Sequence, residues 1–232
     1  MAASQDIEGL ERALGVAFRD RSVLRAALVH RSYVHEQAAR TSSNERLEFL
    51  GDAFLGFVAA DALMRAFPGV QEGELTQLRT ALVRKETLAE LAASLNLGDY
   101  LYLGHGEAQA GGRHRTMNQA RAMEAIMGAV LVDQGYEAAR SWLLALLSPV
   151  LQRLAREGPP QDEKSILQEM VQARGLSSPD YRVVEASGPP HKRTFVVEVR
   201  AGDVVGKGTG RSKHAAEQAA ARAALAELRG RS

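Results

Sequence analysis

Apolar residues in the first two-thirds of the chain recur at the spacing of helices. The segments with this spacing are residues 7–14, 22–29, 47–64, 75–95, 123–132 and 138–154. Glycine and proline interrupt the pattern near residues 68–69, 104–106 and 111–112. Alternation with a period of two is almost absent before residue 160. The pattern predicts an all-helical domain over residues 1–156.

A second domain is predicted after Gly158-Pro159-Pro160, which indicates a linker over residues 157–161. Beyond it the pattern predicts a helix over 163–173, three strands over 181–186, 194–200 and 203–210, and an alanine-rich helix over 213–228. Ala201-Gly202 supplies the hairpin turn between the second and third strands. The predicted fold class is therefore an all-helical domain followed by an α-β-β-β-α domain over residues 162–230.

Composition narrows the classes of protein that fit this pattern. The 232 residues include no cysteine, which excludes disulfides, thiolate zinc sites and a cysteine nucleophile. The longest stretch without a charged residue has 12 residues, 141–152, whereas a membrane span needs about 20. The first residues lack the basic and apolar regions of a signal peptide. We therefore expect a cytoplasmic protein that does not contact membranes.

Charge is distributed unequally between the two predicted domains. The whole chain carries a formal net charge of +1. Residues 158–232 hold 12 basic and 9 acidic side chains, an excess of +3, and residues 1–157 carry the remaining −2. The C-terminal domain is thus the better candidate for binding an anionic partner.

Three carboxylates lie in the apolar segment 47–64 and just before it. Glu45, Glu48 and Asp52 are spaced i, i+3 and i+7, which places them within about 60° of one another on a helix. The other residues are so apolar that we expect the helix to be buried nearly all round. Burying unpaired carboxylates costs several kcal/mol, so a positive charge must compensate them. A divalent metal held by oxygen ligands is the leading candidate.

Glu124 repeats this anomaly in the apolar segment 123–132. Two facing helices that each offer carboxylates can close a metal site, as they do in helical bundles. Oxygen ligands suit Mg²⁺ or Mn²⁺, and a pair of such ions about 3.5–4 Å apart suits phosphodiester hydrolysis.

Each carboxylate also has a purely structural interpretation. The alternatives are a capping box between Ser42 and Glu45, a surface salt bridge of Glu48 with Arg46 or Arg79, a hydrogen bond from a loop to Asp52, and an ion pair of Glu124 with Arg121 or Arg115.

The run NERLEFLGD at residues 44–52 matches the signature of the ribonuclease III family in every position. The resemblance extends over essentially the whole chain. It includes His30-Arg31-Ser32, Glu72-Gly73, Leu82-Val83-Arg84, Gly104-x-Gly106-Glu107, Gly111-Gly112 and Glu124-Ala125. The chain resembles a bacterial ribonuclease III.

The resemblance implies a helical nuclease domain that forms a homodimer with two active sites along a valley for duplex RNA. Each site would hydrolyse one strand with Mg²⁺, for which Mn²⁺ substitutes, and leave 5′-phosphate and 3′-hydroxyl ends. No small-molecule cofactor is implied. Precursors of ribosomal RNA and other structured transcripts are the expected substrates.

Several residues match functional positions of the family. Glu48, Asp52 and Glu124 match the metal-binding carboxylates, and Asp52 and Glu124 would be central to catalysis. Glu45 and Glu72 match two further acidic positions in the valley. Phe49 falls where the family has an aromatic residue at the dimer contact, although an ordinary core phenylalanine fits the sequence as well.

The match fails at Arg121, where the family has an aspartate that acts as a further metal ligand. An arginine does not bind a cation, and its guanidinium is expected to pair with Glu48 or Glu124 instead. The neighbouring Met117, Asn118 and Gln119 also depart from the small or aliphatic residues usual there. A second interpretation is therefore a double-stranded RNA-binding protein with a weakened or inactive nuclease site. A phosphohydrolase of small molecules is a third, which the C-terminal domain disfavours.

The last predicted helix begins with Ser212, a natural N-cap, followed by Lys213 and His214. Cations in a first turn oppose the helix dipole, but they fit a phosphate bound there.

The α-β-β-β-α order resembles the double-stranded RNA-binding domain, which recognises the shape of a duplex more than its sequence. The RNA contacts that this resemblance implies are Gln168, Glu169, His191, Arg211, Ser212, Lys213 and His214. The family often has basic residues at the positions of His214 and Glu217, so we expect modest, salt-sensitive affinity.

Overall fold

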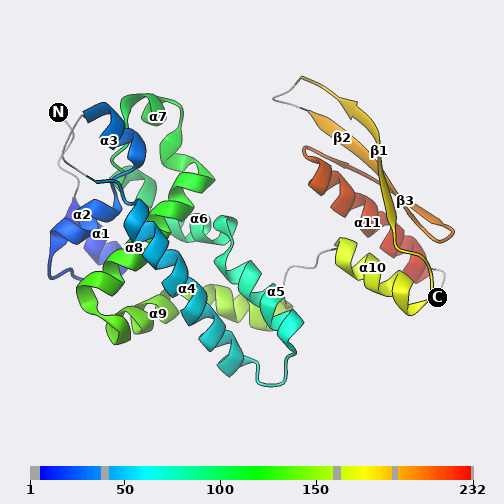
Figure 1. The fold of residues 1–232 in the computed structure, drawn as a ribbon, viewed down its shortest axis with the longest axis horizontal. Coiled ribbons are helices and arrows are strands. Elements are labelled where there is room, and N and C mark those ends of the chain that lie inside the picture. Colours follow the sequence, from blue (N-terminus) through cyan, green and yellow to red (C-terminus); the bar gives the residue numbers. More distant parts are fainter. Residues whose placement is uncertain (1–5, 38–41, 159–162, 190–192, 231–232) are drawn as a thin grey trace. The chain divides into compact units, whose positions relative to one another are not determined.

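The computed structural model describes residues 6–37, 42–158, 163–189 and 193–230 (Figure 1). The chain forms two compact units, Met1–Pro159 and Pro160–Ser232, and each is described by itself below. Within the described ranges, every helix is too short or too polar to span a membrane.

The described residues of the first unit form helices, as the apolar pattern predicts, apart from an isolated β-bridge between Val29 and Tyr102. Its helices are α1 (Ile7–Leu14), α2 (Arg21–Ala27), α3 (Arg31–Gln37), α4 (Glu45–Ala66), α5 (Glu72–Val83), α6 (Lys85–Ser94), α7 (His105–Gln109), α8 (Thr116–Gln134) and α9 (Tyr136–Glu157), with 3₁₀ turns at Leu97–Tyr100 and Gly112–His114. The short helices α3 and α7 carry no periodic apolar run, so the pattern alone does not predict them.

One predicted helix is wrong in extent. Residues 75–95 form two helices, α5 and α6, rather than one. The backbone of Arg84 is extended (φ −63°, ψ 151°), which ends α5 and begins α6. Thr87 Oγ1 donates a 2.9 Å hydrogen bond to the carbonyl of Ala81, which α5 leaves without a helical partner at its end. This local hydrogen bond favours the break between α5 and α6, and the spacing of apolar residues does not reveal it.

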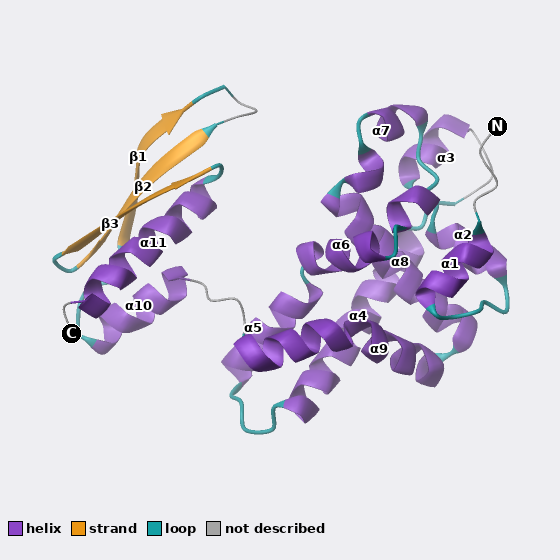
Figure 2. Cartoon of the chain, turned by 180° about the vertical axis from the view of Figure 1, so that it is seen from behind, coloured by secondary structure: helices purple, strands orange, loops and turns teal. Residues whose placement is uncertain are grey.

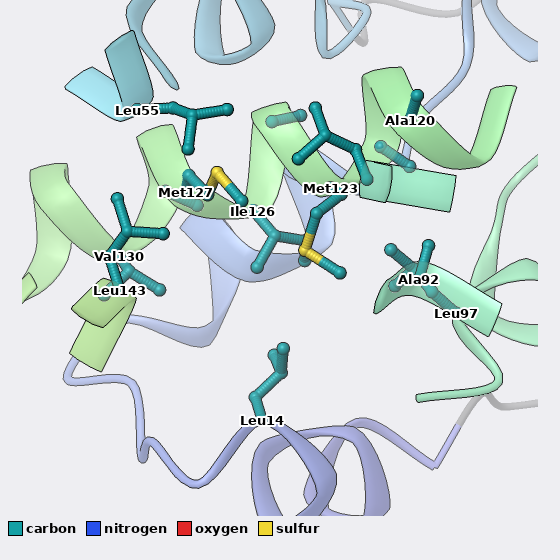
Figure 3. Packing of buried hydrophobic residues seen from close by; sticks show 14 of the residues in the cluster. Leu14, Leu55, Ala92, Leu97, Ala120, Met123, Ile126, Met127, Val130 and Leu143 are labelled. Carbon is teal, nitrogen blue, oxygen red and sulfur yellow. The ribbon is translucent and has the colours of Figure 1, made fainter. Parts of the chain in front are cut away.

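Helix α8 forms the centre of the hydrophobic core. Met123, Ile126 and Met127 are fully buried and lie between residues of the surrounding helices, such as Leu55 of α4 and Leu143 of α9 (Figure 3). A helix that is apolar on nearly all sides is stable in water only when other helices cover it. The core therefore holds the backbone in the middle of α8 in place, including the positions of its few polar residues.

Helix α4 differs from the prediction that it is buried nearly all round. Phe54, Leu55 and Val58 are buried against α8, but Phe49 and Phe57 on another face are 80% and 60% exposed. The pattern identifies α4 as a helix but does not distinguish burial inside one chain from an apolar face left uncovered.

The second unit contains α10 (Glu163–Ala173), β1 (Asp180–Ser187), β2 (Thr194–Ala201), β3 (Val204–Gly210) and α11 (Lys213–Gly230). The strands form one antiparallel sheet in the order β1-β2-β3. Helix α11 packs on β2 and β3, and α10 packs on α11 (Figure 2). The predicted α-β-β-β-α fold class is confirmed.

Glycines and alanines bring α11 unusually close to the sheet. A Cβ atom on Gly206 or Gly208 would collide with the backbone of α11 around Ala220, and one on Gly210 would lie 2.5 Å from the amide nitrogen of Ala216. The buried alanines of α11 face these glycines. The Gly-x-Gly-x-Gly spacing of β3 thus places the N-terminus of α11 firmly against the sheet.

Candidate active site

The site is built where α4 crosses α8. A Cβ atom on Gly51 would collide with the carbonyl oxygen of Glu124, and one on Gly128 would collide with that of Leu47. The two helices therefore approach backbone to backbone at these glycines. This contact places the first turns of α4, with their carboxylates, beside Glu124 of α8.

Glu48, Asp52 and Arg121 lie close enough to Glu124 for their charges to act on it. Burial, together with the negative charges of Asp52 and Glu48, raises the pKa of Glu124 to about 7, although the positive charge of Arg121 opposes this shift. Burial also raises the pKa of Glu48, against the effect of Arg121. The predicted metal ligands thus form one electrostatic group in which ionisation is unfavourable without a nearby positive charge.

Arg121 provides part of that positive charge. Its Nε lies 3.4 Å from Glu48 Oε1, and both side chains are partly exposed. Glu48 and Glu124 are the two expected partners of the guanidinium, and in the structure it pairs with Glu48. The alternative pairings of Glu48 with Arg46 or Arg79 do not occur among the ion pairs of the described residues. Arg115 pairs instead with Glu107 at 2.6 Å.

The donor chemistry fits a hard divalent cation, because all three side chains are carboxylates. The arrangement is not a closed ligand cage: within the described part of the chain, no three His, Asp or Glu side chains are grouped tightly enough to form one. Asp52 is exposed, Glu124 is half-buried, and Glu48 is held by Arg121. The residues present therefore fit, by the chemistry of their donor atoms, a cation that keeps some of its water.

The two supporting acids differ in position. Glu45 belongs to the same group, since its charge raises the pKa of Glu48. Glu72 is exposed at the start of α5, where it accepts a 3.0 Å hydrogen bond from Thr76 Oγ1, and it is not among the charges that perturb Glu48 or Glu124. The structure thus brings Glu45 to the site and leaves Glu72 outside it.

The capping box predicted as an alternative role for Glu45 is wrong. Asn44, not Ser42, precedes the first residue of α4, and its side chain makes no capping hydrogen bond. Asn44 Nδ2 instead donates to the carbonyl of Ala27 at 3.0 Å, while Glu45 accepts a 2.6 Å hydrogen bond from Ser43 Oγ.

Sequence reasoning missed a polar network that borders the site. The buried Asn118 donates to Glu107 Oε1 at 2.8 Å and to the carbonyl of Gly112 at 3.0 Å, and the first of these bonds lowers the pKa of Glu107. The unusual Asn118 thus fixes the segment before α8 rather than supplying a ligand. In the sequence, this network is marked by the motif Gly104-x-Gly106-Glu107, which contains the acceptor Glu107.

His30 is the second residue that the sequence did not single out. Its Nδ1 lies 2.8 Å from Ser32 Oγ and accepts from the amide of Ser32 at 3.2 Å. Burial lowers its pKa, with Glu107 and Arg121 among the charges acting on it. Burial therefore disfavours the charged form of this imidazole. The triplet His30-Arg31-Ser32 in the sequence marks this position.

Phe49 is exposed and therefore is not an ordinary core phenylalanine, which corrects that alternative. It borders an open cavity of about 650 Å³. The other lining residues are Ala26, Ser42, Ser43, Glu45, Arg46, Leu47, Leu50 and Val132. An aromatic ring and a largely apolar hollow thus lie side by side on one surface.

The second unit presents the predicted N-terminus of α11. Ser212 Oγ accepts a 3.1 Å hydrogen bond from the amide of Ala215, so the predicted N-cap is confirmed. Arg211, Lys213 and His214 are all exposed around this first turn. Three exposed basic side chains at a capped helix N-terminus make a positive surface.

The remaining predicted RNA contacts differ in their exposure and in their hydrogen bonds. Glu169 of α10 is exposed, while Gln168 Nε2 donates to Ser178 Oγ at 3.0 Å. Glu217, where the family often has a basic residue, accepts from Lys164 Nζ at 2.6 Å and is neutralised by it. His191 lies outside the described residues.

Both units match known protein families. Residues 20–151 match the ribonuclease-III-like family, and residues 163–228 match the double-stranded RNA binding motif. Similar curated proteins include Ribonuclease 3 of Dehalococcoides mccartyi, 45% identical over 96% of this chain and 95% of its own length. Ribonuclease 3 of Pseudomonas aeruginosa is 47% identical over 97% of this chain and 96% of its own length.

A solved structure resembles the first unit in particular. The nuclease domain of ribonuclease III from Campylobacter jejuni is 39% identical, with a TM-score of 0.58, and the match covers 62% of this chain and 97% of that one. Its published description refers to a region involved in dimer formation. With the fold, the carboxylates at the α4–α8 crossing and these matches together, the chain belongs to the ribonuclease III family and is an endoribonuclease with a C-terminal double-stranded RNA-binding domain.

Proposed function

We propose that the protein cleaves double-stranded RNA by hydrolysing phosphodiester bonds with the help of a divalent cation, Mg²⁺ or Mn²⁺. The products are 5′-phosphate and 3′-hydroxyl ends, and the substrates are precursors of ribosomal RNA and structured transcripts in the cytoplasm. We propose the same two domains as expected from the sequence, residues 1–156 and 162–230, joined by residues 157–161.

One observation carries the proposal: the pKa of Glu124 is raised to about 7 by burial and by its acidic neighbours Asp52 and Glu48. A structure that holds carboxylates together at a cost in free energy is typical of a functional site. A divalent cation would remove that cost, since it favours the ionised form of each ligand.

Asp52 and Glu124 would hold the cation, joined by Glu48 when Arg121 releases it, and Glu45 would add negative charge nearby. Glu72, which lies outside this group, would be a supporting acidic side chain elsewhere in the RNA valley. Bound Mg²⁺ would supply a Lewis acid for the oxygens of the scissile phosphate. The chain's own contribution is positioning. The glycine contacts at Gly51 and Gly128 fix the separation of the two helices, and the core around α8 holds the backbone of Glu124 in place.

The second unit would supply affinity for the duplex. Lys213, His214 and Arg211 surround the capped N-terminus of α11, where a phosphate is favoured by both the side chains and the backbone amides. Gln168, Glu169 and His191 would add contacts to the minor groove. Binding of this kind recognises the shape of a double helix, which explains why a duplex rather than a small phosphate ester is the proposed substrate.

We also propose that the nuclease unit works as a homodimer. The exposed ring of Phe49 lies at the edge of an open cavity that is large enough to receive an aromatic ring, so a two-fold axis at this surface would place each ring in the partner's cavity. Two copies would present two carboxylate groups, one for each strand of the duplex.

The direct test is to incubate the purified protein with an end-labelled RNA duplex and with one of its single strands, in Mg²⁺, in Mn²⁺ and in EDTA. We expect the duplex alone to be cut, only with a metal, and we expect Glu124→Gln to abolish cutting while duplex binding is retained. If the wild type cuts in neither metal but still binds the duplex, the nuclease proposal is wrong.

That outcome would favour the second candidate, a double-stranded RNA-binding protein with a weakened nuclease site. The contact of Arg121 with Glu48 is the observation in its favour. The positive guanidinium already neutralises part of the negative charge that would otherwise attract a metal ion.

A further inference from the structure

Arg121 lies among the carboxylates of the candidate active site. Arg121 lies one turn before Glu124 on α8, so both side chains leave the helix on neighbouring positions of one face. Its charge acts on Glu48 and on Glu124 alike. A permanent positive charge is thus anchored inside the group of carboxylates that a cation is proposed to bind.

The geometry of the contact decides how firmly Arg121 holds Glu48. Nε approaches Oε1 at 3.4 Å, which is long for a charged hydrogen bond and is not the bidentate arrangement of a strong arginine–carboxylate pair. The side chains of Arg121 and Glu48 are 38% and 23% exposed, so water screens the pair. A divalent cation therefore has access to Glu48 and is able to compete for it.

We propose that Arg121 is a resident counter-ion that competes with the divalent cation for Glu48. It keeps the carboxylate group compensated when no metal is bound, and it lowers the affinity of the site for metal. This inference rests on the proposed function, because it concerns the same cation site.

Two consequences follow from electrostatics. Replacing Arg121 by a neutral residue removes one positive charge from the site, so the cation should bind more tightly. The same change leaves Glu48, Asp52 and Glu124 without their nearest compensation in the absence of metal, so the fold should become less stable until a cation is added. The wild type should show neither strong metal affinity nor a strong dependence of stability on metal.

The experiment compares the wild type with Arg121→Gln, Arg121→Lys and Arg121→Asp, all as full-length proteins without RNA. Mn²⁺ affinity is measured by electron paramagnetic resonance of the free ion, and Tm is measured in EDTA and in Mg²⁺. We expect Arg121→Gln to bind Mn²⁺ about tenfold more tightly, which corresponds to one modest charge interaction. Its Tm should fall in EDTA and recover in Mg²⁺. Arg121→Lys should resemble the wild type, and Arg121→Asp should bind Mn²⁺ most tightly.

Arg153→Gln is the matched control. Arg153 of α9 is also partly exposed and touches a carboxylate through one nitrogen, Nη2, at 3.9 Å from Glu90 Oε2. Removing its charge should leave Mn²⁺ affinity and the metal dependence of Tm unchanged. In a Glu48→Gln background, Arg121→Gln should have a smaller effect on Mn²⁺ affinity than in the wild type, because the residue for which the two cations compete is gone.

The possible results separate this inference from the proposed function. Equal Mn²⁺ affinity of the wild type and Arg121→Gln, together with metal-dependent cutting of duplex RNA, would overturn the counter-ion role and leave the nuclease intact. If none of the four proteins binds Mn²⁺, both proposals are wrong.

Discussion

Glu124 is the residue whose protonation should be visible in the stability of the protein. Its pKa is about 7 in the folded chain and 4.5 in the absence of structure. Between these values the folded state binds a proton that the unfolded state has released, so the free energy of unfolding decreases as pH rises from about 4.5 to about 7. In EDTA we expect this group to make the wild type less stable at pH 8 than at pH 5. The difference should be smaller than about 3 kcal/mol, because Glu124 is only half-buried and water screens part of its interactions. Denaturant unfolding of the wild type and Glu124→Gln would measure the difference, which should vanish in the variant.

Glu11 is the control, because its effect on stability should depend on pH in the opposite direction to that of Glu124. Its hydrogen bond from the amide of Phe18 lowers the pKa of this carboxyl, and Arg21 lowers it further. Ionised Glu11 therefore stabilises the fold above pH 4.5, and this contribution is lost as pH falls through its folded pKa. Glu11→Gln should reduce stability at neutral pH and matter less in acid. A common pH slope for both variants would contradict the assignment of a raised pKa to Glu124.

At the scale of elements, the crossing of α4 and α8 depends on Gly51. An added Cβ at this position meets the carbonyl oxygen of Glu124, in the middle of a helix whose backbone is held by the core. Because backbone has to move, we expect Gly51→Ala to lower the free energy of unfolding by roughly 3 kcal/mol or more. The carboxylates should also move apart, so any cleavage that remains should require more metal. Chemical denaturation and a titration of activity against Mg²⁺ would test both effects.

Gly73 provides the matched substitution. It lies in α5, and an added Cβ there meets nothing within 4 Å. Gly73→Ala should therefore be neutral or stabilise the fold by up to about 1 kcal/mol, because alanine favours helix. If Gly51→Ala were tolerated equally well, the close contact of the two helices would not be what positions the site.

These elements also show what the sequence could reveal. The i, i+3, i+7 spacing of Glu45, Glu48 and Asp52 predicts one helical face because it depends only on local geometry. The partner of Glu48 did not follow from spacing, since Arg121 reaches it from a helix about seventy residues later. The break at Arg84 depends on one side-chain hydrogen bond, made by Thr87, and no periodicity records such a bond.

At the scale of the whole molecule, the capped N-terminus of α11 should control affinity for RNA rather than chemistry. Lys213 is exposed in the first turn, where it would contact a phosphate. We expect Lys213→Ala to weaken duplex binding by roughly fivefold and to reduce the slope of log affinity against log salt by about one. The effect should appear in KM, with kcat nearly unchanged. Filter binding at several salt concentrations and steady-state cleavage would separate these quantities.

Lys207 is the control in the same unit. It lies on β3 and forms a 3.5 Å ion pair with Glu198 rather than facing the start of α11. Lys207→Ala removes the same charge from the domain, so it should change affinity by less than twofold if position matters. Equal losses for both lysines would mean that RNA responds only to net charge.

Assembly is the last property that one residue should decide. Phe49 is 80% exposed beside an open cavity lined by Leu50 and Val132, and exposed aromatic rings are common at the centre of interfaces. Phe49→Asp places a charge where the partner's cavity would receive the ring, so we expect a monomer by light scattering at concentrations where the wild type is a dimer. Because each copy keeps its own core, the variant should remain folded. Val184→Asp alters an exposed valine of β1 and should leave the mass unchanged. A dimer that persists in Phe49→Asp would place the interface elsewhere.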